Sequence, residues 1–365
     1  MTDDIILPYS FSRRQTTDKL GRRITYYLSG AQESGPGVSK STLDLARTAR
    51  YSAMDLAALQ AAAAAEGAGA ESAVEDDREK LLPLVVLVQG GGGGSIFQRT
   101  KTPGEVAIDK FPLSQTVMDR FEGKARILMV EKPGVQFLEE GHDPSGGIGI
   151  GCSETYLRQH ALPRWAEAIN SAIFNVRTNS LVNPKKTLVL GTSEGGIVAA
   201  KIASLDKTVT HVACLYGGGP GEIEELKDLA RRGLLEGQDQ SLSPDARVQE
   251  IEDEWKKILE DPRSITKFWR GHTYLRWHSF ASESLVDNLL ASQAKIFIAH
   301  GTKDTVSPIE SFDAMLAKLQ ASGREVVHER VEGAEHEFKF TEADGSKWSI
   351  LDAFYERILL WFLNT

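Results

Sequence analysis

The stretch that decides the fold is "KTLVLGTSEGGIVAAKIAS", residues 186–204. Its apolar residues read as a strand that is buried on both faces. Gly191, Ser193 and Gly195 then form the pattern G-x-S-x-G, and a helical stretch rich in alanine follows. Small residues two positions before and after the serine let strand and helix approach closely, and the turn lifts the hydroxyl above the sheet edge. The segment predicts a nucleophile elbow carrying Ser193, and a plain Gly/Ser turn is the alternative.

Short apolar runs like this one recur along the chain. They cover residues 24–30, 84–88, 126–134, 211–219, 295–304 and 325–333. Amphipathic stretches with helical spacing lie between several of them, among them residues 156–177 and 308–323. Alternation of buried strands and amphipathic helices predicts an α/β protein with a mostly parallel sheet covered on both faces.

Two segments interrupt this alternation. Residues 41–80 begin as an alanine-rich helical pattern and end in a Gly/acid-rich linker. Residues 219–290 are rich in helical pattern and aromatic side chains and contain no convincing strand, which predicts a helical cap. We therefore divide the chain into a core segment at 1–218 with the insert near 41–80, a cap at 219–290 and a second core segment at 291–365.

A serine hydroxyl needs a base to take its proton. In an elbow of this type the base follows the nucleophile and the acid along the chain, and three of the eight histidines follow residue 295. His300 ends a predicted strand, and His328 lies inside one, where we expect it to contribute to stability. His336 lies in the polar loop "EGAEHEF", from which a side chain can reach the serine. We predict that His336 is the base, a surface histidine being the alternative.

The acid is expected at the end of the strand before that histidine. "IFIAHGTKDTVSPIES", residues 296–311, places Asp304 just after a strand and a glycine turn. Active-site groups gather at the carboxyl ends of strands in open parallel sheets. Asp304 would then orient His336 and stabilise its protonated form. A turn aspartate is the alternative interpretation of Asp304, and Asp313 is the alternative acid.

The oxyanion of an acyl-transfer intermediate needs backbone donors. One is the amide of Glu194, directly after the serine, and the other comes from the loop after an earlier strand. Five glycines at 90–94 follow the apolar run that ends at residue 88. Gly91 is the first choice and Gly92 the second. A phosphate-binding loop is the competing interpretation, but neither a Lys-Ser/Thr pair nor a dinucleotide fingerprint follows.

The overall composition excludes several function classes. The chain has 365 residues, 41% of them apolar, and a net charge of −9 without a basic stripe, which argues against nucleic-acid binding. Its longest apolar runs are too short to span a bilayer, and its first residues do not resemble a secretory signal. We expect a cytoplasmic protein with no metal, cofactor or membrane partner. The oligomeric state stays open.

From about residue 84 onward the chain resembles the α/β-hydrolase superfamily. "GTSEGG", "GTKDTVSPIES" and "GAEHEF" are similar to the nucleophile, acid and histidine motifs of its prolyl oligopeptidase-like and esterase-like branches. The resemblance implies a catalytic triad of Ser193, Asp304 and His336 and an eight-stranded, mostly parallel sheet with a variable cap. The glycine loop begins with Gln89, where many members carry histidine.

Substrate choice in such a protein depends on the cap. We expect Trp269, Trp277 and Tyr274 to line an apolar pocket, and the alternative is that they pack the cap onto the core. The resulting prediction is a serine hydrolase that cleaves a carboxylic ester of a small or medium substrate through an acyl-enzyme. An aminopeptidase-like hydrolase of amides or short peptides is the runner-up. A non-catalytic binding protein is disfavoured, because all three triad positions are filled.

Overall fold

The computed structural model describes most of the chain, in three ranges with four single gaps: residues 7–30, 81–141 and 149–365, apart from Pro103, Lys110, Pro112 and Ser180. The insert predicted near residues 41–80 lies outside the described residues.

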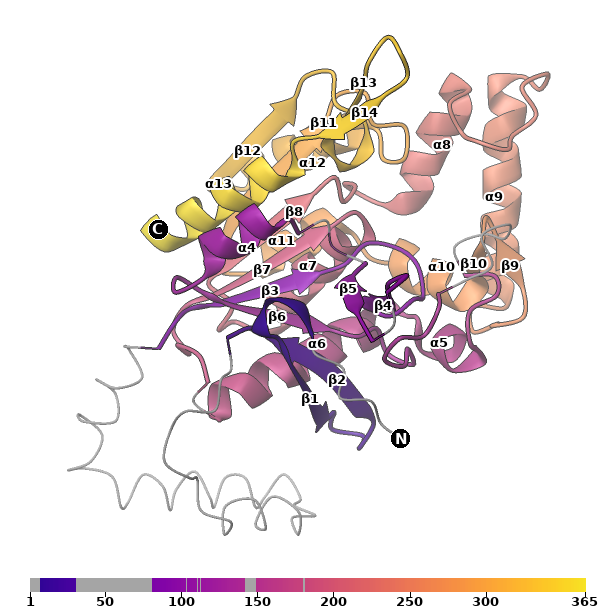
Figure 1. Cartoon of the computed structure of the whole chain (residues 1–365). Coiled ribbons are helices and arrows are strands. Elements are labelled where there is room, and N and C mark those ends of the chain that lie inside the picture. Colours follow the sequence, from indigo (N-terminus) through magenta and orange to yellow (C-terminus); the bar gives the residue numbers. More distant parts are fainter. Residues whose placement is uncertain are drawn as a thin grey trace.

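Eight strands form one twisted sheet at the centre of the fold (Figure 1). In spatial order they are β1 (Ser12–Thr17), β2 (Arg23–Leu28), β6 (Arg126–Val130), β3 (Leu84–Val88), β7 (Thr187–Thr192), β8 (His211–Leu215), β11 (Lys295–Gly301) and β12 (Val326–Val331). The pairs β1–β2 and β2–β6 are antiparallel, and all other neighbours are parallel. The predicted mostly parallel sheet is confirmed, and each of the seven apolar runs supplies one strand.

Helices cover both faces of the sheet. One face carries α6 (Leu162–Thr178), α7 (Glu194–Leu205), α11 (Leu285–Ala291) and α12 (Ile309–Ala321), and the other carries α4 (Gln115–Phe121) and α13 (Leu351–Asn364). None of the helices in these described ranges combines the length and the apolar character that crossing a bilayer requires.

The central strands are apolar on both faces because both faces are covered. Every residue of β3 and β7 is buried. Val86 and Val189 pack with the helices of the first face, whereas Val85 and Leu188 pack with those of the second. Alternate residues therefore belong to two separate apolar cores, one on each side of the sheet.

Short elements lie at the periphery of the sheet. They are the hairpins β4 (Phe97–Arg99) with β5 (Val106–Ile108) and β13 (Lys339–Thr341) with β14 (Lys347–Ser349), the turns η1 (Pro8–Ser10) and η2 (His336–Phe338), and the helix α5 (Glu154–Gln159).

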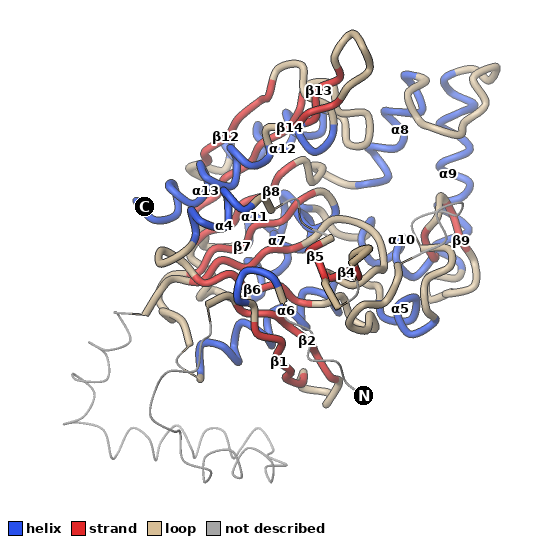
Figure 2. The backbone as a smooth tube through the Cα atoms, in the orientation of Figure 1, coloured by secondary structure: helices blue, strands red, loops and turns tan. Residues whose placement is uncertain are grey.

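The first part of the segment between β8 and β11 stands apart from the sheet (Figure 2). It contains α8 (Glu222–Arg232), α9 (Pro244–Glu260), β9 (Phe268–Trp269), β10 (His272–Thr273) and α10 (Tyr274–Ala281), and then α11. Apolar residues of α8, α9 and α10 form two small clusters of their own. The structure differs from expectation in two respects: β9 and β10 form a short hairpin, and α11 packs on α7 as part of the core.

Candidate active site

The connection between β7 and α7 has the tight geometry that the sequence predicted. Ser193 has φ 53° and ψ −127°, a backbone conformation that residues other than glycine rarely adopt. A Cβ on Gly191 would lie 1.9 Å from the carbonyl oxygen of Gly195, and one on Gly195 would lie 2.3 Å from that of Val88. Both glycines are therefore required, because strand and helix pass too close for any side chain.

Ser193, His336 and Asp304 form one hydrogen-bonded chain. His336, at the start of η2 after β12, places Nε2 3.1 Å from Ser193 Oγ. Its Nδ1 donates to Asp304 Oδ2 over 2.7 Å. The other oxygen of Asp304 accepts the amides of Val306 at 2.8 Å and Ser307 at 3.0 Å. An imidazole oriented in this way can accept the serine proton through Nε2.

The electrostatics keep Asp304 ionised. Burial raises the pKa of this carboxyl, but the hydrogen bond to His336 and the nearby His300 outweigh burial and leave the pKa below its ordinary value. An ionised, buried carboxylate can stabilise an imidazolium at the position of His336.

The alternative residues considered from sequence do not reach Ser193. His300 donates through Nε2 to the Ser307 carbonyl over 2.8 Å and so supports the Asp304 loop. Asp313 pairs with Arg330 on the surface of α12 and β12. His328 is exposed on the edge strand β12. The expectation that His328 contributes to stability is therefore wrong, because an edge-strand side chain facing solvent buries little.

The glycine loop after β3 passes beside the serine. A Cβ on Gly90 would lie 3.3 Å from the Ser193 Cβ. Gly91 lines the same cavity as Ser193. Gly92 has φ 95°, which a residue with a side chain would adopt only under strain. The structure thus brings the predicted loop to the serine, with Gly91 at the cavity wall.

A cavity of about 360 Å³ opens above Ser193 and His336. Its walls come from the ends of the strands and from the segment between β8 and β11. The residues that line it are Gly91, Ser193, Glu194, Ile197, Tyr216, Gly217, Gly218, Glu222, Glu225, His272, Arg276, Val306, Ser307 and His336. One wall is therefore charged.

A buried network of charges centres on the Glu194 side chain. Arg276 donates to Glu194 Oε2 through Nε at 3.0 Å and through a terminal nitrogen at 2.7 Å, and it also binds Glu222 over 2.8 Å. His160 Nε2 lies 3.0 Å from Glu194 Oε1. Burial raises the pKa of Glu194, but His160, Arg276 and Lys132 outweigh burial and hold the pKa well below its ordinary value. These partners are distant in sequence, so only the fold reveals them.

Glu225 on α8 is a second buried carboxyl at this wall. It accepts the Gly219 amide over 2.6 Å and the Ser307 hydroxyl over 3.2 Å. Burial, and to a lesser extent the charge of Glu222, raise the pKa of Glu225 from 4.5 to about 8. The folded protein therefore binds this proton more tightly than the unfolded chain. The stability that results is complete below about pH 4.5 and is lost as the pH rises through about 8.

We therefore expect Glu225→Gln to remove part of the loss of stability that accompanies a rise in pH from about 5 to 8. Between about pH 5 and 8, the melting temperature of the wild-type protein should fall relative to that of the variant, and above about pH 8 the two curves should run parallel. Thermal melts across both ranges measure the difference. Parallel curves for the two proteins in the lower range as well would mean that Glu225 does not titrate there.

The three aromatic residues that we predicted at the pocket do not line this cavity. The Trp277 indole donates to the Trp269 carbonyl over 2.7 Å, and the two rings lie 4.7 Å apart. Tyr274 donates its hydroxyl to Glu254 on α9. All three pack among the helices between β8 and β11. The sequence shows that aromatic residues are frequent in this segment but not which way their side chains point. The structure corresponds to the alternative in which they pack the segment together.

Trp277→Ala should accordingly act on stability. Truncating a buried tryptophan costs roughly 3 kcal/mol or more in free energy of unfolding, while relative kcat/KM values for esters of different chain length should stay unchanged. Denaturant titration and a set of p-nitrophenyl esters measure the two quantities. A folded variant with an altered chain-length profile would contradict this placement.

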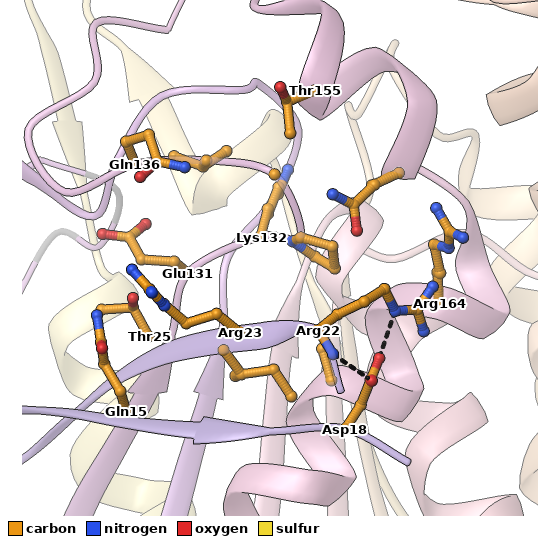
Figure 3. Close-up of a pocket in the computed structure, with 16 residues that line it drawn as sticks. Gln15, Asp18, Arg22, Arg23, Thr25, Glu131, Lys132, Gln136, Thr155 and Arg164 are labelled. Atoms are coloured by element: carbon orange, nitrogen blue, oxygen red, sulfur yellow. Dashed lines mark hydrogen bonds and ion pairs between the residues drawn. The ribbon is translucent and has the colours of Figure 1, made fainter. Parts of the chain in front are cut away.

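A second cavity, of about 450 Å³, is lined by neither Ser193 nor His336. It lies between the β1–β2 hairpin, the end of β6 and α5–α6 (Figure 3). Asp18 and Arg22 form an ion pair on one of its walls, and Glu131 and Lys132 follow β6 at another. It is separate from the serine's cavity.

No protein-family model matches the sequence, and no curated protein matches it. Solved structures do match in fold. A puromycin-hydrolyzing peptidase from Mycobacterium tuberculosis is 12% identical with a TM-score of 0.52, and the match covers 98% of this chain and 40% of that one. The chain has the α/β-hydrolase fold.

Two further structures show the same relationship. Dipeptidyl peptidase 4 from Porphyromonas gingivalis is 8% identical with a TM-score of 0.54, with 97% of this chain and 35% of that chain covered. An acylaminoacyl peptidase from Pyrococcus horikoshii is 12% identical with a TM-score of 0.50, with 97% and 41% covered. This α/β-hydrolase-fold chain thus spans well under half the length of these peptidases.

Proposed function

We propose that this chain is a serine hydrolase that cleaves a carboxylic ester of a small or medium substrate through an acyl-enzyme. The observation that carries the proposal is the hydrogen-bonded chain from Ser193 Oγ through His336 to Asp304, on an elbow that holds Ser193 at φ 53°. This constellation supplies an activated nucleophile, its base and the group that orients the base.

This geometry supports the following reaction. Ser193 Oγ bonds to the substrate carbonyl carbon while His336 Nε2 takes the hydroxyl proton. The carbonyl oxygen becomes an oxyanion that accepts hydrogen bonds from the amides of Glu194 and Gly91, with Gly92 as the second choice for the loop donor. His336 then protonates the leaving alcohol as its bond to carbon breaks. Water attacks the acyl-Ser193 by the same steps and releases the acid.

The volume of the cavity supports a substrate of modest size. At about 360 Å³ it lies near the lower end of the range for small-molecule sites, roughly 300–1,000 Å³. Ile197 and Val306 provide apolar surface beside the serine. This favours short or medium acyl groups over long chains.

An aminoacyl amide or short peptide is the second candidate substrate, and the charged wall favours it. Arg276 is already engaged by Glu194 and Glu222, so it is not available to a substrate carboxylate. Glu222 and Glu225 both line the cavity, but Glu222 is bound to Arg276, so Glu225 is the carboxyl that a substrate cation would meet. A substrate ammonium group would complement Glu225 in its ionised form, which is reached near pH 8.

A matched substrate panel separates the two candidates. p-Nitrophenyl esters of rising chain length report on the first, and alanyl-p-nitroanilide beside its N-acetyl derivative reports on the second. Turnover of the esters with no preference for the free amine supports the ester hydrolase. A strong preference for the free amine, lost in Glu225→Gln, supports the aminoacyl hydrolase. Absence of turnover on every member would contradict both.

We also propose that α8, α9 and α10 form the cap of this site. Glu222, His272 and Arg276 belong to this segment and line the cavity, and the helices have apolar clusters of their own. The cap then ends before α11, inside the 219–290 segment expected from sequence.

A cytoplasmic location is part of the proposal. Cys214 is a buried, free thiol, which suits a reducing compartment.

A further inference from the structure

Lys132 is a fully buried cation beneath the glycine loop. It follows β6, and its side chain has no exposed surface. Its Nζ donates to the carbonyl of Gly90 over 2.7 Å and to that of Gly92 over 2.8 Å. The ring of Trp165 lies under the ammonium, with 4.2 Å between Nζ and the ring centroid.

These two hydrogen bonds decide where the loop amides point. In a trans peptide the carbonyl of one residue and the N–H of the next point in opposite directions, and no described peptide bond is cis. Because the Gly90 carbonyl points at Lys132, the N–H of Gly91 points away from it. Gly91 lines the cavity above Ser193, so its N–H is directed toward the side on which the substrate carbonyl would lie.

The same ammonium contacts the other half of the oxyanion site. Lys132 Nζ forms an ion pair with Glu194 Oε1 at 3.4 Å. The amide of Glu194 is the first of α7 and directly follows Ser193. Fixing the Glu194 side chain restrains the residue that carries this amide. One buried charge thus touches both segments that would donate to the oxyanion.

We propose that Lys132 is the positioning residue of the oxyanion hole, holding the Gly91 and Glu194 amides at the spacing that the developing oxyanion requires. Lys132 does not itself touch substrate. The inference rests on the proposed serine hydrolase function and names the group that preorganises that site. A purely structural lysine would affect stability alone, whereas a positioning lysine affects the stability of the transition state.

Lys132→Met keeps most of the length of the side chain and removes its charge. We expect kcat to fall about 10²-fold or more, as when an oxyanion donor is lost, with little change in KM. The inhibition constant of phenylboronic acid, which forms a tetrahedral anionic adduct on serine, should rise by a similar factor. Ester kinetics and boronate inhibition are measured on protein shown to be folded by circular dichroism.

Lys186→Met is the matched control. Lys186 also donates to a backbone carbonyl, that of Leu363 at 2.9 Å, and also lies over an aromatic ring, that of Phe362 at 5.4 Å. It precedes β7 at the end of the sheet opposite Ser193. Its replacement removes the same kinds of contact, so any loss of stability should come without a change in kcat or boronate affinity.

A second pair of variants keeps the test decisive if Lys132→Met does not fold. Glu194 and Glu222 balance the charges of Lys132 and Arg276, so removing Lys132 leaves one excess buried negative charge. Lys132→Met/Glu194→Gln restores the balance. Its kcat is compared with that of Glu194→Gln alone, and we expect it to be lower by a similarly large factor.

The outcomes separate this inference from the proposed function. Wild-type protein that turns over no ester or amide and binds no boronate would contradict the proposed function. An active wild type with an unchanged kcat and boronate affinity in Lys132→Met, or equal kcat values in the second pair, would overturn the role of Lys132 alone. A rise in KM with unchanged kcat would also overturn it.

Discussion

Ser193→Ala should abolish turnover, with a loss in kcat of about 10⁶-fold, the size found when the nucleophile of a serine protease is removed. The reason is chemical, because alanine leaves His336 without a hydroxyl to activate. The substitution keeps the Cβ at the strained turn and removes one half-buried oxygen, so the fold should persist. Ester hydrolysis and thermal melts measure the two effects on the same preparation.

Ser171→Ala is the control for this variant. The Ser171 hydroxyl donates to the Glu167 carbonyl one turn earlier in α6, over 2.9 Å. Its loss should leave activity at the wild-type level. If Ser193→Ala retained more than a few per cent of wild-type activity in a clean preparation, another nucleophile would have to carry the reaction.

His336→Ala is expected to have a comparable effect, again about 10⁶-fold in kcat, because base and nucleophile act as one unit. His336 bridges Ser193 and Asp304, so its removal leaves a hydroxyl without a base and a buried carboxylate without its partner. The melting temperature should therefore also fall somewhat. Steady-state kinetics and thermal melts report both quantities.

His328→Ala provides the comparison for that variant. Its side chain is exposed on the edge strand β12, eight residues before His336. We expect activity and stability equal to those of the wild type. Equal loss of kcat in both folded variants would contradict the assignment of His336 as the base.

The strands of the fold could be predicted because burial on both faces leaves a simple signal. A strand such as β3 or β7 lies between two layers of helices, so its residues are apolar without interruption. β1 escaped prediction because it lies at the sheet edge and its sequence, "SRRQTT", alternates between half-buried and exposed positions. Its polar residues carry little of the apolar pattern on which the prediction depends.

The candidate site was predictable where local geometry demands particular residues. Gly191 and Gly195 have no room for a Cβ. Both positions therefore have to be glycine, and the elbow can be recognised from five residues of sequence. His336 and Asp304 could be placed because strand ends meet at one edge of a parallel sheet. The expected order along the chain, nucleophile then acid then base, narrowed the choice of acid and base.

The charged parts of the site could not be predicted in this way. Arg276 binds Glu194 across 82 positions of sequence, and Lys132 reaches Glu194 across 62. In the sequence, each of these charged residues looks like one on a solvated surface. Only the fold shows that they are buried and paired. The pocket prediction for the aromatic residues of the cap failed for a related reason, since a tryptophan such as Trp277 is equally suited to a pocket and to a small core.

The most direct test of the central claim is covalent labelling with a fluorophosphonate, followed by mass spectrometry of the digested protein. The account predicts one phosphonylated residue, Ser193, and no label on heat-unfolded protein or on Ser193→Ala. Folded wild-type protein that takes up no label, or that carries it on another residue, would contradict the claim that Ser193 is the activated nucleophile of this site.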